Sequence, residues 1–171
     1  RATANNHPTK DAMWFFGTRT TFWELYLKVN RFANALIEKG VKKGDRVGIL
    51  LPNCPQFVIS FWALLSVGAI VTNMNPMYTV DEMKGIFDTT DAKMIICFDG
   101  IIGNVKALTD IRDIPLVVVT RLADYMPGAG LSSAAELGLK PEWHYFAELL
   151  AKTESCIRPR ITIDPEKDPA V

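Results

Sequence analysis

Long apolar runs that alternate with polar segments set the pattern of this chain. One such run covers residues 47–51, has no polar alternation, and is typical of a strand buried on both faces, as in a parallel sheet. Asn53 is the expected N-cap of the next element, and Pro55 falls in its first turn, where a missing N–H costs nothing. The predominantly apolar segment 57–67 predicts a helix buried over most of its surface. Gly68 is expected to end this helix as a left-handed C-cap.

A second buried strand is predicted to begin at residues 69–71, directly after this helix. Two parallel strands need such a crossover, so the strand–helix–strand unit indicates the centre of an α/β fold. Further apolar runs at 93–98 and 116–120 predict two more strands, with a helix over 102–111 between them. This alternation predicts a mostly parallel sheet with helices packed on it.

The first forty residues predict a small hairpin and a long helix. Residues 1–11 are polar, and we expect them to lack regular structure, whereas residues 13–22 predict a hairpin that turns at Gly17. The tetrapeptide TFWE at 21–24 fits a capping box, in which Thr and Glu side chains satisfy each other's free amides. It predicts a helix from residue 22 to about residue 39.

The last third of the chain carries a weaker pattern. Residues 121–142 are rich in Gly and Pro and predict an irregular loop, and residues 143–150 predict a short amphipathic helix. Residues 170–171 resemble the start of another strand. No internal repeat divides the sequence, so we interpret residues 1–171 as a single N-terminal subdomain.

Composition narrows the function. The chain has 19 Lys and Arg residues and 19 Asp and Glu residues, so its net charge is zero. It therefore lacks the overall positive charge that would attract nucleic acid. The longest apolar stretch falls short of a membrane span, and no secretory signal pattern opens the chain. The three cysteines are far apart and lack a C-x-x-C motif. We therefore expect reduced thiols in a cytoplasmic protein, and association with a membrane surface stays open.

We predict no catalytic, cofactor-binding or metal-binding residue within this chain. Cys54 stands at a helix start that would lower the pKa of its thiol, but neither His7 nor His144 is near it in sequence to act as a base. These two histidines are also too few and too far apart for a zinc site. The acidic residues at 164, 166 and 168 alternate as in a calcium loop but lack its Gly and its closing Glu.

Two glycine-containing segments resemble phosphate loops only in part. The segment GAGLSS at 128–133 lacks the third Gly of a dinucleotide fingerprint, and GIIG at 100–103 lacks the Lys-Ser/Thr of a phosphate-clamping loop. We interpret the first as a loop and the second as a tight turn. The acidic pair Asp81 and Glu82 follows Thr79 at a predicted helix start, where negative charge is favoured, so we assign it a structural role.

Residues 13–120 resemble the N-terminal part of the adenylate-forming acyl-CoA synthetases, the AMP-binding enzymes. Several spaced motifs match in order, and their sequences are most similar to those of fatty acyl-CoA ligases. These motifs are TFWEL at 21–25, GDRV at 44–47, LPN at 51–53, LLSVGAIV at 64–71 with NP at 75–76, YT at 78–79 with Glu82, and DAK at 91–93.

The resemblance implies a parent enzyme that joins a fatty acid to ATP as an acyl-adenylate and passes the acyl group to coenzyme A. ATP, Mg and CoA are therefore implied for the full-length parent, and fatty acid and CoA are its implied partners. The family places its phosphate loop just after a strand that would begin at residue 170, so we expect this chain alone to be structural and inactive. A homodimer or other self-association is also expected to be possible.

Two other interpretations stay open at this stage. The first is an independent α/β binding or signalling module, such as a receiver-like domain. A receiver needs an acidic pair after its first strand, where this chain has Pro52 and Asn53, and it wants an Asp that ends a central strand, a role open to Asp99. The second is a truncated relative that acts only as a scaffold.

Overall fold

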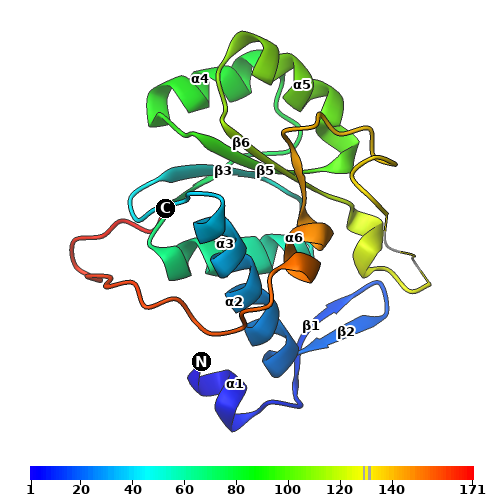
Figure 1. The fold of residues 1–171 in the computed structure, drawn as a ribbon, viewed down its shortest axis with the longest axis vertical. Helices are drawn as coiled ribbons and strands as arrows, with labels where there is room; N and C mark the ends of the chain where they lie inside the picture. Colours follow the sequence, from blue (N-terminus) through cyan, green and yellow to red (C-terminus); the bar gives the residue numbers. More distant parts are fainter. Residues whose placement is uncertain (129, 131) are drawn as a thin grey trace.

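A five-stranded parallel sheet lies between two layers of helices (Figure 1). The computed structural model describes residues 1–128, 130 and 132–171. The strand order is β4-β3-β5-β6-β7, and every neighbouring pair is parallel. The predicted α/β class is confirmed, with strands at β3 (Arg46–Leu50), β4 (Ile70–Asn73), β5 (Met94–Phe98), β6 (Leu116–Thr120) and β7 (His144–Tyr145).

Each face of the sheet has its own hydrophobic core. Helices α2 (Phe22–Glu38), α3 (Pro55–Val67) and α6 (Phe146–Lys152) cover one face, while α4 (Val80–Thr90) and α5 (Ile102–Ile111) cover the other (Figure 1). Neighbouring residues of one strand enter opposite cores, because side chains alternate across a strand. In β3, for example, Ile49 packs toward α3 and Leu50 packs toward α4. This double burial explains why the strands appear as continuous apolar runs.

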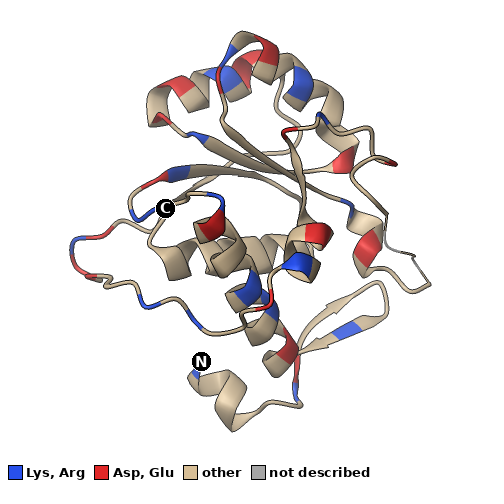
Figure 2. Cartoon of the chain, in the orientation of Figure 1, with Lys and Arg blue, Asp and Glu red and all other residues tan. Residues whose placement is uncertain are grey.

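Both helix layers carry charged residues, but α3 carries none. Figure 2 shows Lys, Arg, Asp and Glu interspersed along α4 and α5, whereas α3 carries none of them.

Gly48 in β3 allows the α4 layer to approach the sheet closely. A Cβ atom there would lie 2.4 Å from the Met74 side chain and 2.9 Å from the Phe87 ring. The sheet therefore needs glycine at this position.

Local capping signals place the helix ends. Thr21 and Glu24 form the predicted capping box of α2, and Thr79 and Glu82 form a second one at α4. Gly68 ends α3 in the left-handed conformation, at φ 74°, as predicted. The N-cap of α3 is Cys54, so the prediction of Asn53 is wrong. Asn53 stands one residue too early, since Pro55 is already the first helical residue.

The N-terminal segment is more ordered than predicted. A short helix, α1 (Ala2–Asn6), replaces the expected irregular start, because burial of Ala4 holds it although it has no apolar periodicity. The predicted hairpin is present as β1 (Asp11–Phe15) and β2 (Thr18–Thr21), which pair antiparallel.

Two C-terminal predictions need correction. The predicted helix over 143–150 is a two-residue strand, β7, followed by α6, because residues 144–145 find hydrogen-bonding partners on β6. Residues 170–171 do not form a strand. The Ala170 carbonyl nevertheless accepts a hydrogen bond of 2.9 Å from the Val71 amide, so the chain does reach the exposed edge of β4.

The remaining described elements are short. Two 3-10 turns, η1 (Asp99–Ile101) and η2 (Leu122–Tyr125), follow β5 and β6. The described part of residues 126–142 is irregular, as predicted. Among the described helices, none combines the length and the apolar character needed to cross a bilayer.

Candidate functional site

The topology marks one edge of the sheet as the expected place for a ligand. From β3 the chain crosses to β4 on one side and then returns to β5 on the other side, so the strand order reverses between β3 and β5. In open α/β sheets, ligands bind beyond the carboxyl ends of the strands at such a switch point. Here that edge is formed by residues 51–54 after β3 and by η1 after β5.

A buried ion pair with a tyrosine lies at the same edge, beyond β6 and β7. The Asp124 side chain is only 2% exposed, and its two oxygens are both engaged: the Arg121 Nε donates to one at 3.1 Å, and the Tyr145 hydroxyl donates to the other. Burial, followed by the hydrogen bond with Asp124, raises the pKa of Tyr145. The hydroxyl therefore stays protonated, and the network ties η2 to β7.

This network was missed by sequence reasoning. Asp124 and Tyr145 are 21 residues apart, and no local motif links them. The Asp124 carboxylate is buried, and each of its oxygens accepts a hydrogen bond from a side chain that it holds in place. We therefore assign the network a structural role.

Three buried oxygens lie near the same edge without a hydrogen-bond partner among the described residues: Gln56 Oε1, Ser60 Oγ and Thr120 Oγ1. The Gln56 amide nitrogen donates to the Arg121 carbonyl at 2.9 Å, which joins the first turn of α3 to the end of β6. Ser60 lies one turn further along the same buried face of α3. These three oxygens are thus polar atoms within an otherwise apolar interior.

Cys54 is not an activated thiol. It is buried, and its burial raises the pKa of its thiol despite its position at the start of α3. Cys97 is also buried, and its pKa is raised for the same reason. Cys156 is half-buried, and the Arg31 Nε lies 3.0 Å from its sulfur. All three are free thiols, as the sequence predicts.

The glycine-containing segments have structural explanations where the structure describes them. A Cβ atom on Gly100 would lie 2.4 Å from the Phe98 ring, so this turn needs glycine for packing. In the segment 128–133, Ala129 and Leu131 lie outside the described residues. Gly130 accepts a hydrogen bond of 2.8 Å from Arg121 through its carbonyl, which ties the described part of this loop to the edge network.

The acidic candidates are also engaged in local structure. Glu82 completes the capping box of α4, and the Asp168 carboxylate accepts from the Asp164 amide at 2.6 Å and pairs with Lys43 at 2.5 Å. Among the described residues, no three His, Cys, Asp or Glu side chains gather as metal ligands. The expectation that this chain supplies no catalytic, cofactor or metal residue stays a prediction.

Comparison with known proteins identifies the family. The family model described as AMP-binding enzyme matches residues 1–169. A long-chain-fatty-acid–CoA ligase of Bacillus subtilis is 33% identical over 124 residues, which cover 72% of this chain and 22% of that protein. A long-chain-fatty-acid–CoA ligase of Salmonella typhimurium is 29% identical over 127 residues, covering 74% and 23%.

Solved structures show the same fold. The apo structure of MbtA from Mycobacterium smegmatis superposes with a TM-score of 0.73 at 25% identity, covering 99% of this chain and 28% of that one. A benzoate CoA ligase from Burkholderia xenovorans gives 0.74 at 17% identity, covering 94% and 29%.

The fold and the matched residues place this chain in the class of adenylate-forming ligases, as the N-terminal part of such an enzyme. The chain belongs to the AMP-binding enzyme family, as its motifs indicated. It spans about a fifth of the length of these curated relatives. The strand order alone also fits a receiver-like module, but the family match removes that alternative.

Proposed function

We propose that this chain is the N-terminal segment of a fatty acid–CoA ligase. The parent converts ATP, a fatty acid and CoA to acyl-CoA, AMP and pyrophosphate through an acyl-adenylate. The observation that carries the proposal is the family match over residues 1–169, together with relatives that are named long-chain-fatty-acid–CoA ligases.

Within that parent, we assign this chain a structural role. Its parallel sheet is buried on both faces. The carboxylates of Asp124 and Asp168 are engaged by side chains of the same chain. The described residues offer neither a metal-ligand cluster nor a Gly-rich loop followed by Lys that would hold nucleotide phosphates. ATP, Mg and CoA are therefore assigned to other parts of the parent, and no chemical step is routed through this chain.

Two further aspects belong to the same proposal. The free thiols fit a cytoplasmic parent, at or away from a membrane surface. The chain on its own is proposed to self-associate, because it exposes large apolar side chains such as Trp14, Phe16 and Trp62.

A carboxylate panel with the full-length parent tests the substrate class. AMP release is measured with ATP, Mg²⁺ and CoA, and with acetate, benzoate and saturated fatty acids of increasing length. The proposal predicts the highest kcat/KM with a fatty acid. A preference for benzoate or another aryl acid would contradict the fatty-acid assignment while leaving the family unchanged.

A further inference from the structure

A cavity of about 350 Å³ lies between α2, η2 and α6, beside the turn of the β1–β2 hairpin. Helix α2 contributes Lys28 and Arg31 to its wall, and Thr18 borders it on the hairpin side. Most of the remaining wall is apolar and comes from Met126, Phe146, Ala147, Leu150 and Ala151. Ligand pockets hold roughly 300–1,000 Å³, so this small cavity suits one or two side chains of a partner.

Two cations in the wall of this cavity have no carboxylate partner. Lys28 and Arg31 lie one turn apart on α2, and neither comes within 4 Å of an Asp or Glu oxygen in the described part of the chain. The Lys28 ammonium lies 4.6 Å from the centre of the Tyr125 ring, and the Arg31 Nε lies 3.0 Å from the Cys156 sulfur. An aromatic face and a thiol are weak partners, so neither cation is neutralised.

Lys28 is also half-buried. Burial lowers the pKa of its ammonium group, although Glu24 one turn earlier opposes this shift. The Glu24 carboxylate accepts from the Thr21 amide in the capping box of α2, and Asp124, which also lines the cavity, is engaged in the buried network described above. A half-buried cation without a carboxylate partner is stabilised by an anion that enters the cavity.

The hairpin beside the cavity presents large aromatic side chains to solvent. Trp14 is 68% exposed and Phe16 is 70% exposed. The hairpin turn lies against the loop after η2, since a Cβ atom on Gly17 would lie 3.8 Å from the Pro127 Cγ (Figure 1). Phe16 has a positive φ of 47°, which strains a bulky residue, so the turn carries an exposed ring at a cost in backbone energy.

The cavity and the hairpin together fit a protein better than a small molecule or a bilayer. Exposed aromatic residues and Arg are typical of the residues that dominate protein–protein binding. A small molecule in the cavity would leave Trp14 and Phe16 uncovered. A bilayer surface is flat and cannot enter the cavity to reach the half-buried Lys28, whereas a protruding side chain can.

We propose that this cavity and the hairpin tip form a docking surface for an acidic segment of a partner protein. An Asp or Glu side chain of the partner enters the cavity and pairs with Lys28 and Arg31. A bulky apolar residue beside that acid packs on Phe16. The inference goes beyond the proposed function, because docking requires neither the substrates of the ligase nor its turnover.

Selection from a random peptide library tests the chemistry of the partner. Phage-displayed peptides are selected on the immobilised full-length parent, and an enriched peptide is labelled and titrated by fluorescence anisotropy. We expect the enriched peptides to share an Asp or Glu beside a bulky apolar residue. Replacing that acid by its amide should weaken binding roughly tenfold, because a charge-assisted hydrogen bond is lost.

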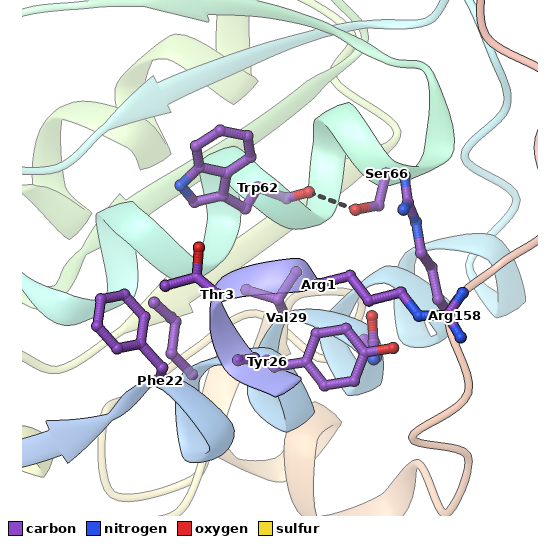
Figure 3. Close-up of a pocket in the computed structure, with 11 residues that line it drawn as sticks. Arg1, Thr3, Phe22, Tyr26, Val29, Trp62, Ser66 and Arg158 are labelled. Carbon is purple, nitrogen blue, oxygen red and sulfur yellow. Dashed lines mark hydrogen bonds between the residues drawn. The ribbon is translucent and has the colours of Figure 1, made fainter. Parts of the chain in front are cut away.

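The cations are tested in the parent with a matched control. Lys28→Met/Arg31→Gln should weaken the labelled peptide by at least about tenfold, since the acid loses both of its partners. Arg158→Gln should leave the affinity unchanged. Arg158 is exposed and also lacks a carboxylate within 4 Å among the described residues, but it lines a different cavity, of about 410 Å³, between α1, α2 and α3 (Figure 3).

The strained hairpin turn offers a variant that separates binding from folding. Residues 16 and 17 both have positive φ in a two-residue turn, and Phe16→Asn gives this turn the Asn-Gly pair that such hairpins prefer. The thermal midpoint should therefore stay unchanged or rise, while the affinity for the peptide falls several-fold. Unchanged affinity in this folded variant would contradict the part assigned to Phe16.

Several other results would overturn the proposal. These are enriched peptides without acids, unchanged affinity in Lys28→Met/Arg31→Gln, an equal loss in Arg158→Gln, or full competition by N-acetylglutamate alone, which would indicate a small-molecule site. Binding to the 171-residue chain but not to the parent would show that the parent itself covers this surface. A parent dimer that Lys28→Met/Arg31→Gln dissociates in sedimentation velocity would assign the surface to a second copy. Circular dichroism of each variant verifies that the fold is kept.

Discussion

The Lys43 ammonium lies 2.5 Å from the Asp168 carboxylate and also donates to the Thr162 carbonyl at 2.9 Å. Lys43 stands between α2 and β3, whereas its two partners belong to the C-terminal segment that crosses the surface of the molecule. The pairing lowers the pKa of Asp168, mainly through the hydrogen bond from Lys43. One exposed lysine thus fastens residues 162–168 to the body of the fold.

Replacing this lysine should release the segment. In Lys43→Met, we expect trypsin to cleave after Arg160 several times faster, because the segment loses its ion pair and a hydrogen bond to its backbone. Lys42→Met is the matched control: it removes the neighbouring exposed lysine and one tryptic site, but no side-chain partner of Lys42 is present among the described residues. Equal cleavage rates in both variants would contradict the fastening role.

Gly68 should tolerate no side chain, for two separable reasons. Its φ of 74° strains any L-residue, and a Cβ atom there would lie 2.9 Å from the Lys43 Cγ. Gly40 has a similar φ of 88° with nothing within 4 Å of an added Cβ, so it isolates the backbone strain.

We expect Gly40→Ala to lower the free energy of unfolding by roughly 1–2 kcal/mol, the cost of a left-handed L-residue. Gly68→Ala should cost about 1 kcal/mol more because of the added contact, and Gly68→Val should be largely insoluble. Urea denaturation of the soluble variants measures the difference. Equal midpoints for the two alanine variants would show that the contact with Lys43 relaxes freely.

The buried hydroxyls near the sheet edge should be dispensable for stability. Ser60→Ala and Thr120→Val remove oxygens that have no partner among the described residues, so each should leave the free energy of unfolding unchanged or raise it by up to about 1 kcal/mol. Gln56→Leu is expected to cost roughly 1–2 kcal/mol, since the Arg121 carbonyl loses its donor. A loss of more than about 1 kcal/mol in Thr120→Val would show that its hydroxyl is satisfied after all.

The three thiols should react at two different rates. The sequence predicts three reduced thiols without ranking their reactivity, and the structure leaves Cys156 half-exposed while Cys54 and Cys97 are buried. Titration with a thiol reagent should therefore show one fast group in the native protein and two that appear on unfolding. Cys156→Ser should abolish the fast phase. A fast phase that persists in this variant would assign the reactivity to Cys54 or Cys97 and contradict the burial of these two thiols.

The sequence predicts those features that depend on neighbours along the chain. The capping boxes at Thr21 and Thr79 need only four consecutive residues, and the left-handed Gly68 follows from one helix end. Helix α1 and strand β7 are missed because each depends on a distant partner: α1 on burial of Ala4, and β7 on its ladder with β6. Two residues carry too little pattern to reveal a strand.

The same limit applies to the site. In the Arg121–Asp124–Tyr145 network, Tyr145 is 21 positions away from Asp124, so no spacing rule reveals the contact between them. The motifs that do identify the family lie in helix caps and helix-to-strand joints, where local packing fixes the sequence. These motifs therefore indicate the fold of the chain, but they do not identify catalytic residues.

Pyrophosphate exchange tests the central claim most directly. The full-length parent and the 171-residue chain are compared at equal concentration with ATP, Mg²⁺ and a panel of fatty acids. Our proposal predicts exchange that depends on fatty acid in the parent and none above background in the chain, which has no cradle for the transferring phosphates among its described residues. Exchange by the chain alone, with contaminating ligase excluded, would contradict its structural role, and a silent parent would contradict the proposed ligase activity.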